Sequence, residues 1–362
     1  MNVMKEKNNK NKNKMISKKA LLIVMLSISC TSVLKNSNKV ISKVTIDTLL
    51  LEKINIRAIS VSGNKVFYAA DKNRVGFINV LSNKKTVCAI RQDSLVIEFR
   101  SCAAIKDAFF SLSISNPALL YKLSTDLNSK KLVYTEHNAN VFYDSMQFYD
   151  NWNGIAVGDP INGQMSIITT RDSGETWQKN SHLNSPNLAD GEAFFAASNT
   201  TISIKNGKTW LVSGGEKSRV FYSEDKGMTW KIFESPIVHG EKMTGTFTSD
   251  FYNDKIGIIA GGNYEKPEQN YQNKALTVDG GRTWKLVGEN QGFGYASCIQ
   301  FFPKSAGRKI VSVGLTGMYI SEDFGLNWTK LSDDKSLFTL RFLNKNTAIA
   351  GGKNKIIKIN FQ

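Results

Sequence analysis

One octapeptide, Thr170-Arg171-Asp172-Ser173-Gly174-Glu175-Thr176-Trp177, sets a pattern that returns three times further along the chain. The later copies begin at Ser223, Thr277 and Ser321, and all four follow the form Ser/Thr-x-Asp-x-Gly-x-Thr/Asn-Trp. Five positions that recur at fixed offsets indicate an internal repeat, which constrains a fold more strongly than composition does.

The chemistry of this repeat predicts a tight turn. An Asp followed two residues later by Gly is typical of a hairpin in which the carboxylate accepts backbone N–H bonds and the Gly adopts a positive φ. The hydroxyl residue can close the turn, and the Trp can pack against a neighbouring sheet. We therefore predict a structural role for Asp172, Gly174, Trp177, Asp225, Gly227, Trp230, Asp279, Gly281, Trp284, Asp323, Gly325 and Trp328.

The spacing of the repeat predicts the architecture. The motif aspartates are separated by 53, 54 and 44 residues, which is the length of one four-stranded propeller blade. An apolar segment precedes each copy, and similar segments occur at both ends of the chain, at residues 66–70, 108–112, 155–158, 211–214, 258–261, 311–314 and 348–351. The count predicts a single all-β propeller of seven four-stranded blades over residues 46–362.

The chain ends suggest how the ring closes. Only one strand's worth of alternating residues, 356–361, follows the last apolar segment. We expect the N-terminal segment 41–51 to complete the last blade, so that no sheet edge stays open. No amphipathic helical pattern interrupts residues 46–362.

The N-terminus has the features of an export signal. Lys18 and Lys19 precede the uncharged apolar stretch 20–28, which is shorter than the roughly 20 residues of a membrane-spanning helix but typical of a signal-peptide core. Residues 1–29 are therefore expected to be removed. The true start is either Met1 or Met15.

The end of this signal resembles the lipobox of bacterial lipoproteins. A small residue, Ser29, precedes Cys30, although Ser27 stands where the lipobox prefers Leu. We predict that Cys30 carries the lipid anchor, with ordinary cleavage nearby as the alternative, and that residues 30–45 form a flexible tether. The protein would then be an exported lipoprotein of a bacterial periplasm or outer membrane.

The charge does not indicate nucleic-acid binding. Of the net charge of +16, residues 1–29 contribute +6, and the remaining lysines are scattered without interleaved aromatic residues. We therefore expect no nucleic-acid partner. A surface rich in lysine suits an anionic membrane or an acidic partner.

The cysteines and histidines predict neither a metal site nor a cofactor. No Cys-x-x-Cys pair occurs, and His137, His182 and His239 are far apart in sequence. Cys88 and Cys102 could pair in an oxidising compartment, or could be buried thiols. Because no Gly-x-Gly-x-x-Gly follows a strand and no haem motif occurs, redox chemistry has no support either.

The repeats resemble the Asp-box, or bacterial neuraminidase repeat. The segments 142–148, 158–160, 191–199 and 261–264 are further similar to a group of bacterial propellers related to the photosystem II stability and assembly factor. This resemblance implies that the Asp-boxes lie on outer hairpins and that the protein is a non-catalytic scaffold. It also implies a protein partner, which for a lipoprotein would belong to the cell envelope.

Residues on the innermost strands should determine what the axis binds. Aligning the blades places these residues near the axis: Arg57, Arg100, Asp144, Ala193 beside Glu192, Phe247, Ser297 and Phe338. Either the charges pair within a water-filled channel, or Arg57 and Arg100 hold the carboxylate of a ligand or peptide. The candidate ligand- or partner-binding site at the channel mouth comprises Arg57, Arg100, Asp144, Asp159, Glu192, Arg219 and Tyr295.

The main enzymatic alternative is a sialidase-like glycoside hydrolase, since sialidases also resemble Asp-box propellers. Arg57, Arg100 and either Arg219 or Arg341 could form an arginine triad, with Glu192 and Tyr295 as the catalytic couple. However, the Arg-Ile-Pro segment that marks the first sialidase arginine is absent. A glycan-binding propeller without hydrolysis is a further alternative, and no catalytic residue is assigned.

Overall fold

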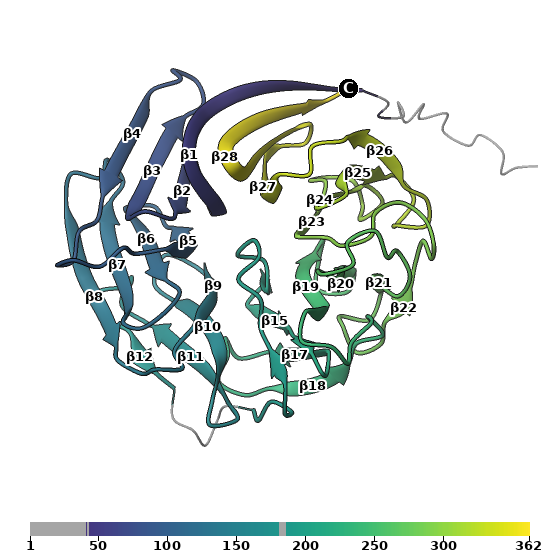
Figure 1. Ribbon diagram of the computed structural model, residues 1–362, viewed down its shortest axis with the longest axis horizontal. Helices are drawn as coiled ribbons and strands as arrows, with labels where there is room; N and C mark the ends of the chain where they lie inside the picture. The colour runs from purple at the N-terminus through teal and green to yellow at the C-terminus, as the bar shows by residue number, and fades with distance from the viewer. Residues whose placement is uncertain (1–40, 42, 181–185) are drawn as a thin grey trace, which may run out of the picture. The chain divides into compact units, whose positions relative to one another are not determined.

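The computed structural model describes residues 41, 43–180 and 186–362, which form a ring of β-sheets around a central axis (Figure 1). This confirms the prediction of a single all-β propeller. The predicted signal peptide and Cys30 lie outside the described residues. Within the described ranges, no helix has the length and apolar character needed to cross a membrane.

Four of the sheets have four strands each, with the first strand nearest the axis and the fourth at the outer edge (Figure 1). The first contains β5 (Phe99–Ala104), β6 (Ala108–Ser113), β7 (Ala118–Ser124) and β8 (Lys130–Glu136). The second contains β9 (Tyr143–Phe148), β10 (Gly154–Ile161), β11 (Gln164–Thr170) and β12 (Gln178–Lys179). The third contains β14 (Ile202–Lys205), β15 (Lys208–Val212), β17 (Arg219–Ser223) and β18 (Lys231–Glu234). The fourth contains β23 (Cys298–Phe301), β24 (Ile310–Gly314), β25 (Gly317–Ser321) and β26 (Thr329–Ser332).

Two further sheets have six strands each. One runs in the order β27 (Leu337–Asn344), β28 (Thr347–Phe361), β1 (Val44–Ser62), β2 (Lys65–Ala70), β3 (Arg74–Asn79) and β4 (Lys85–Ala89). The other runs in the order β13 (Glu192–Ala193), β16 (Gly214–Gly215), β19 (Thr244–Phe251), β20 (Gly257–Asn263), β21 (Lys274–Thr277) and β22 (Lys285–Leu286).

The predicted count of seven four-stranded blades is wrong, because the described residues form six sheets. The main reason is the length of β1 and β28, which contain 19 and 15 residues. β1 pairs antiparallel with β28 from Val44 opposite Phe361 to Asn55 opposite Lys353, and it then pairs with β2. The first and last parts of the chain therefore share one sheet.

The same pairing corrects the expected role of the N-terminal strand. We expected residues 41–51 to complete the last blade. Instead β1 runs without a break through this segment into its hairpin with β2. The described residues contain no separate last blade for it to complete.

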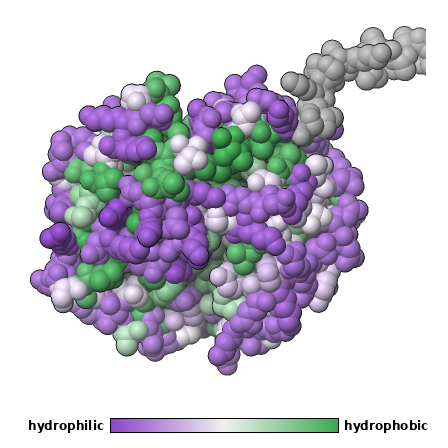
Figure 2. Space-filling model, turned by 45° about the horizontal axis from the view of Figure 1, so that its top comes forward, coloured by the Kyte–Doolittle hydropathy of each residue, from purple (hydrophilic) through white to green (hydrophobic). Residues whose placement is uncertain are grey.

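The apolar core lies between neighbouring sheets. In one such interface, Phe67 of β2 stacks on Phe109 of β6, with ring centroids 4.8 Å apart. On another, Trp210 of β15 stacks on Phe251 of β19 at 3.7 Å and donates an indole hydrogen bond to the Gly280 carbonyl. The outer surface is mainly hydrophilic, with smaller apolar areas (Figure 2).

The four repeated motifs form the predicted turns at the outer edge of their sheets, where they join β11 to β12, β17 to β18, β21 to β22 and β25 to β26. In the first, Asp172 accepts hydrogen bonds from the amide and the hydroxyl of Thr176, and the Thr170 hydroxyl accepts one from the amide of Gly174. The motif glycines have φ values of 72° to 86°. The expectation of a turn closed from both sides is therefore confirmed.

Each turn also holds its Trp against a neighbouring sheet. Trp177 packs edge-on against Phe148 of its own sheet and Phe110 of the next, with centroids 5.7 and 6.2 Å away. Gly174 lies against the ring of Phe110, because a Cβ added at Gly174 would overlap that side chain. The turn and the contact between sheets thus depend on one glycine.

We predict that Gly174→Ala lowers the free energy of unfolding by about 2–4 kcal/mol, through backbone strain at positive φ and overpacking against Phe110. Gly207→Ala is the matched control, because Gly207 has a φ of 78° with no atom within 4 Å of an added Cβ. Its cost should be the backbone part alone, about 1–2 kcal/mol. Urea denaturation of both variants measures the difference, and equal costs would refute the contact between sheets.

Candidate functional site

A segment of chain crosses the axis of the ring. This axial segment, residues 194–201, lies between β13 and β14 and is bonded to strands from all round the ring. It makes hydrogen bonds with Arg57 on β1, Cys102 on β5, Met146 on β9, Ser249 on β19 and Thr339 on β27. Neither interpretation of the channel anticipated this segment, although residues 192–193 do form a short strand, β13.

Asn199 is the centre of this network. Its amide group donates to the Cys102 carbonyl at 2.8 Å, and its side-chain oxygen accepts from the Met146 amide at 2.8 Å. Its own carbonyl accepts from Arg341 at 3.0 Å. The side chain is buried and the residue has a φ of 58°, a conformation that Asn tolerates better than most residues.

Arg57 lies on one side of the axial segment. Its guanidinium stands over the ring of Phe338, 4.1 Å from the centroid, and donates a long hydrogen bond of 3.4 Å to the Ala197 carbonyl. Burial and the nearby charge of Arg100 lower the pKa of Arg57. Arg100 itself is paired with Glu98 at 2.6 Å. Within the part of the chain that the structure describes, Arg57 therefore has unused donors and no carboxylate in hydrogen-bond contact.

Two carboxyl groups lie beside the arginines. Asp144 on β9 is fully buried, and neither of its oxygens has a hydrogen-bond partner within the described part of the chain. Burial and the neighbouring Asp159 raise its pKa well above the usual range, against the attraction of Arg100. Asp159 on β10 accepts a hydrogen bond from the Phe194 amide at 2.9 Å, and burial raises its pKa to about 6.

Tyr295 completes this group, which we call the Arg57 end: Arg57, Arg100, Asp144, Asp159 and Tyr295. Tyr295 is buried edge-on against Phe247 and Tyr264, at 4.8 and 5.2 Å between centroids, and burial raises its pKa. Tyr295 interacts electrostatically with the Arg57 guanidinium. The structure thus brings five of the seven predicted site residues into one electrostatic group.

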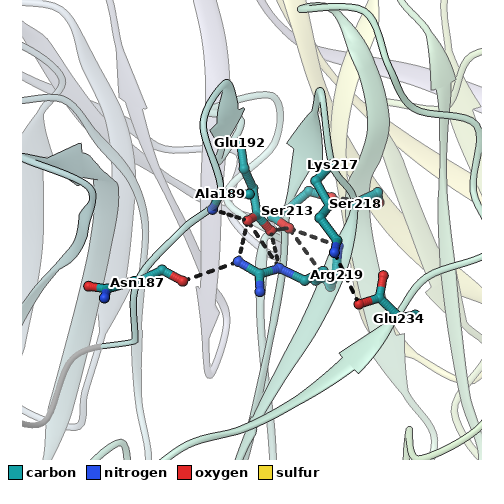
Figure 3. Close-up of polar contacts among 8 residues, drawn as sticks. All are labelled: Asn187, Ala189, Glu192, Ser213, Lys217, Ser218, Arg219 and Glu234. Atoms are coloured by element: carbon teal, nitrogen blue, oxygen red, sulfur yellow. Dashed lines mark hydrogen bonds and ion pairs between the residues drawn. The ribbon is translucent and has the colours of Figure 1, made fainter.

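Glu192 and Arg219 form a second, self-contained group (Figure 3). The Arg219 Nε lies 3.0 Å from both carboxylate oxygens of Glu192, which also accept hydrogen bonds from the Ala189 amide and the Ser213 hydroxyl. The Glu192 side chain has no exposed surface and that of Arg219 is 12% exposed. These charge-assisted hydrogen bonds fix the positions of both side chains.

Cys88, Cys102 and Cys298 are free thiols, the last two buried. Across residues 41, 43–180 and 186–362, no three His, Cys, Asp or Glu side chains are grouped to hold a metal ion.

Comparison with known proteins shows the fold. No protein-family model matches the sequence, and no curated protein matches it. Among solved structures, one described as YCF48 bound to D1 peptide superposes with a TM-score of 0.60 at 11% identity, covering 88% of this chain and 96% of that one. U3-55K and the RRP9 WD40 repeats each give 0.59 at 11% identity, covering 87% and 88% of this chain and 98% and 97% of theirs. At this level of identity, the similarity to these three structures shows the β-propeller fold alone.

We predict that Asn199→Ala lowers the free energy of unfolding by about 3 kcal/mol or more, because the Met146 amide and Cys102 carbonyl would be left buried and unpaired. Asn206→Ala is the control, since Asn206 is exposed with a φ of 51° and has no side-chain hydrogen bond in the described structure. Its cost should stay near 1 kcal/mol. Similar values in chemical denaturation would show that the axial segment does not hold the ring together.

We predict that Asp159→Asn stabilises the protein at pH 7 by about 1–3 kcal/mol and leaves it unchanged near pH 4. The folded protein holds the Asp159 proton up to about pH 6, whereas the unfolded chain loses it near pH 4. The stabilisation from this carboxyl is therefore complete at low pH and is lost as pH rises through 6.

Denaturation from pH 4 to pH 8 measures this difference. Asp190→Asn is the control, because it removes the same charge at an exposed position. If the free energy of unfolding of Asp159→Asn depends on pH in the same way as that of the wild type, the raised pKa of Asp159 is contradicted.

Proposed function

We propose that this protein is a non-catalytic scaffold that binds a partner protein at the Arg57 end, through a carboxylate of the partner. The observation that carries this proposal is the state of Arg57. Its guanidinium is half-buried and makes a single long hydrogen bond among the described residues, while burial and a second guanidinium nearby lower its pKa. A carboxylate would satisfy its unused donors and relieve the repulsion from Arg100.

The buried acids strengthen this argument. Because Asp144 is buried beside Asp159, its protonated form is favoured, and it gives Arg57 no compensating charge. Phe338, Tyr264 and Tyr295 add aromatic surface next to the guanidinium. A segment of the partner in which an acidic residue is followed by an apolar residue would match this combination.

The structural neighbours support binding rather than catalysis. YCF48 has been solved with a peptide of D1, so a propeller of this shape can bind a segment of another protein. For a sialidase, Glu192 would have to activate Tyr295. The described hydrogen bonds join Glu192 to Arg219 and Ser213 instead, and no observation favours hydrolysis.

The same proposal includes the cell envelope. The signal-like residues 1–29 and Cys30 support export and lipid anchoring, with an envelope protein as the partner. The anchor would hold the propeller close to the membrane in which the partner is found. Mass spectrometry of the mature N-terminus tests the lipid at Cys30 directly.

We predict that affinity capture from native membranes recovers a defined envelope protein, and that Arg57→Gln/Arg100→Gln weakens its binding at least tenfold. Arg91→Gln/Arg308→Gln is the control, because it removes the same charge at exposed positions. The captured partner should lose affinity with rising salt, and also when its acidic residues are changed to amides. Binding that survives the Arg57 variant but fails in the control would contradict this assignment.

A further inference from the structure

A cavity lies on the opposite side of the axial segment from Arg57. Its largest part has a volume of about 610 Å³, and two smaller parts of about 180 and 210 Å³ adjoin it. Arg341 lines all three parts, so we call them together the Arg341 cavity. A volume of this size is typical of a site for a small organic molecule.

The innermost strands explain where this cavity lies. Its lining includes Ser60, Gln147, Asp250, Gln300 and Arg341, each three residues beyond a position that the sequence alignment had placed near the axis. Three residues of a strand span about 10 Å. The Arg341 cavity is therefore the other end of the same axis, and the axial segment separates it from Arg57.

Arg341 is held in place by neutral groups. Its guanidinium donates to the carbonyls of Leu340 at 2.8 Å and Asn199 at 3.0 Å. Both acceptors are uncharged, so they orient the side chain without neutralising it. The positive charge stays available to the cavity.

Two lysines add to this charge. Lys205 and Lys304 line the largest part, and neither ammonium group makes a hydrogen bond or ion pair to another described residue. The one acidic group in the lining, Asp250, accepts hydrogen bonds from the amides of Phe301 at 2.7 Å and Phe251 at 3.0 Å. Lys205 and Arg341 are both close enough to Asp250 to act electrostatically on its carboxyl group. With three cations and one acid, the cavity has an excess of positive charge.

One wall of the lining is apolar. Its accessible residues are Val61, Pro303 and Phe342, because Phe251, Phe301 and Phe302 are buried in the cores between sheets. Phe342 packs on the buried Phe302, with ring centroids 4.6 Å apart. A ligand entering here would meet both positive charge and an apolar surface.

We propose that the Arg341 cavity binds a small organic anion, with its carboxylate or phosphate between Lys205, Lys304 and Arg341 and its apolar body against Val61, Pro303 and Phe342. Charge-assisted hydrogen bonds would fix the anionic group, and burial of the apolar part would add affinity. This site is separate from the partner-binding Arg57 end, and either can exist without the other.

Isothermal titration of the full mature chain with phenylacetate and with phenyl phosphate tests this proposal, beside the neutral 2-phenylethanol and inorganic phosphate. We expect both aromatic anions to bind more tightly than either control compound. The tighter of the two identifies the anionic group that the site prefers. Binding of inorganic phosphate as tight as that of phenyl phosphate would overturn the role of the apolar wall.

The variant Lys205→Gln/Lys304→Gln should weaken binding of the aromatic anions at least tenfold. It is preferable to a change at Arg341, whose loss would remove one of the hydrogen bonds that hold the axial segment. Lys84→Gln/Lys345→Gln removes the same charge at exposed positions and should leave the affinity unchanged. Equal loss in both pairs, or no binding of either anion by the wild type at millimolar concentration, would overturn the proposal.

Discussion

The hydrogen bonds of Asn199 are the constraint on which the centre of this ring depends. A polar segment buried at the axis is unfavourable unless its backbone and side chains are bonded. Here the bonds go to the carbonyl of Cys102, the amide of Met146 and the guanidinium of Arg341. These partners belong to strands far apart in sequence, so the segment ties the inner edges of separate sheets together.

Because this segment occupies the axis, the ring has two ends with different chemistry instead of one continuous channel. Arg57 reaches the Ala197 carbonyl from one side, and Arg341 reaches the Asn199 carbonyl from the other. Both arginines are thus oriented by backbone carbonyls that are only two residues apart. The same short stretch of chain positions a charged group for each end.

The sequence was sufficient for the turns and insufficient for the count of sheets. The motif around Asp172 is local, since its hydroxyl, carboxylate and glycine act within eight residues, and the structure reproduces each contact. The number of sheets depends on whether long strands break. Nothing in the composition of residues 44–62 indicates that β1 continues unbroken from its pairing with β28 to its pairing with β2.

The site was predicted in part for a related reason. Alignment of the inner strands found Arg57, Arg100 and Asp144, because each lies on a strand with a recognisable apolar pattern, β1, β5 or β9. It did not anticipate the irregular segment that follows Glu192 and Ala193, which contains Ser, Thr and Asn and reads as an ordinary loop. The far end of the axis was missed because Lys205, Asp250 and Gln300 acquire their meaning only when separate strands meet. The signal that could have found this end is the set of polar residues three positions beyond the aligned ones on the same strands.

The two ends also treat their acidic groups differently, and this difference separates their functions. At the Arg57 end, no described group makes a well-formed hydrogen bond to either oxygen of Asp144, and burial and the neighbouring Asp159 favour the protonated form. At the Arg341 cavity, two backbone amides stabilise Asp250, although burial still raises its pKa. In both places burial favours the protonated, uncharged form of the acid. The acid therefore neutralises the neighbouring cations less than an ionised carboxylate would. Positive charge is left at each end of an axis whose middle is closed by neutral, fully bonded chain, and an external anion is the group that would complete either site.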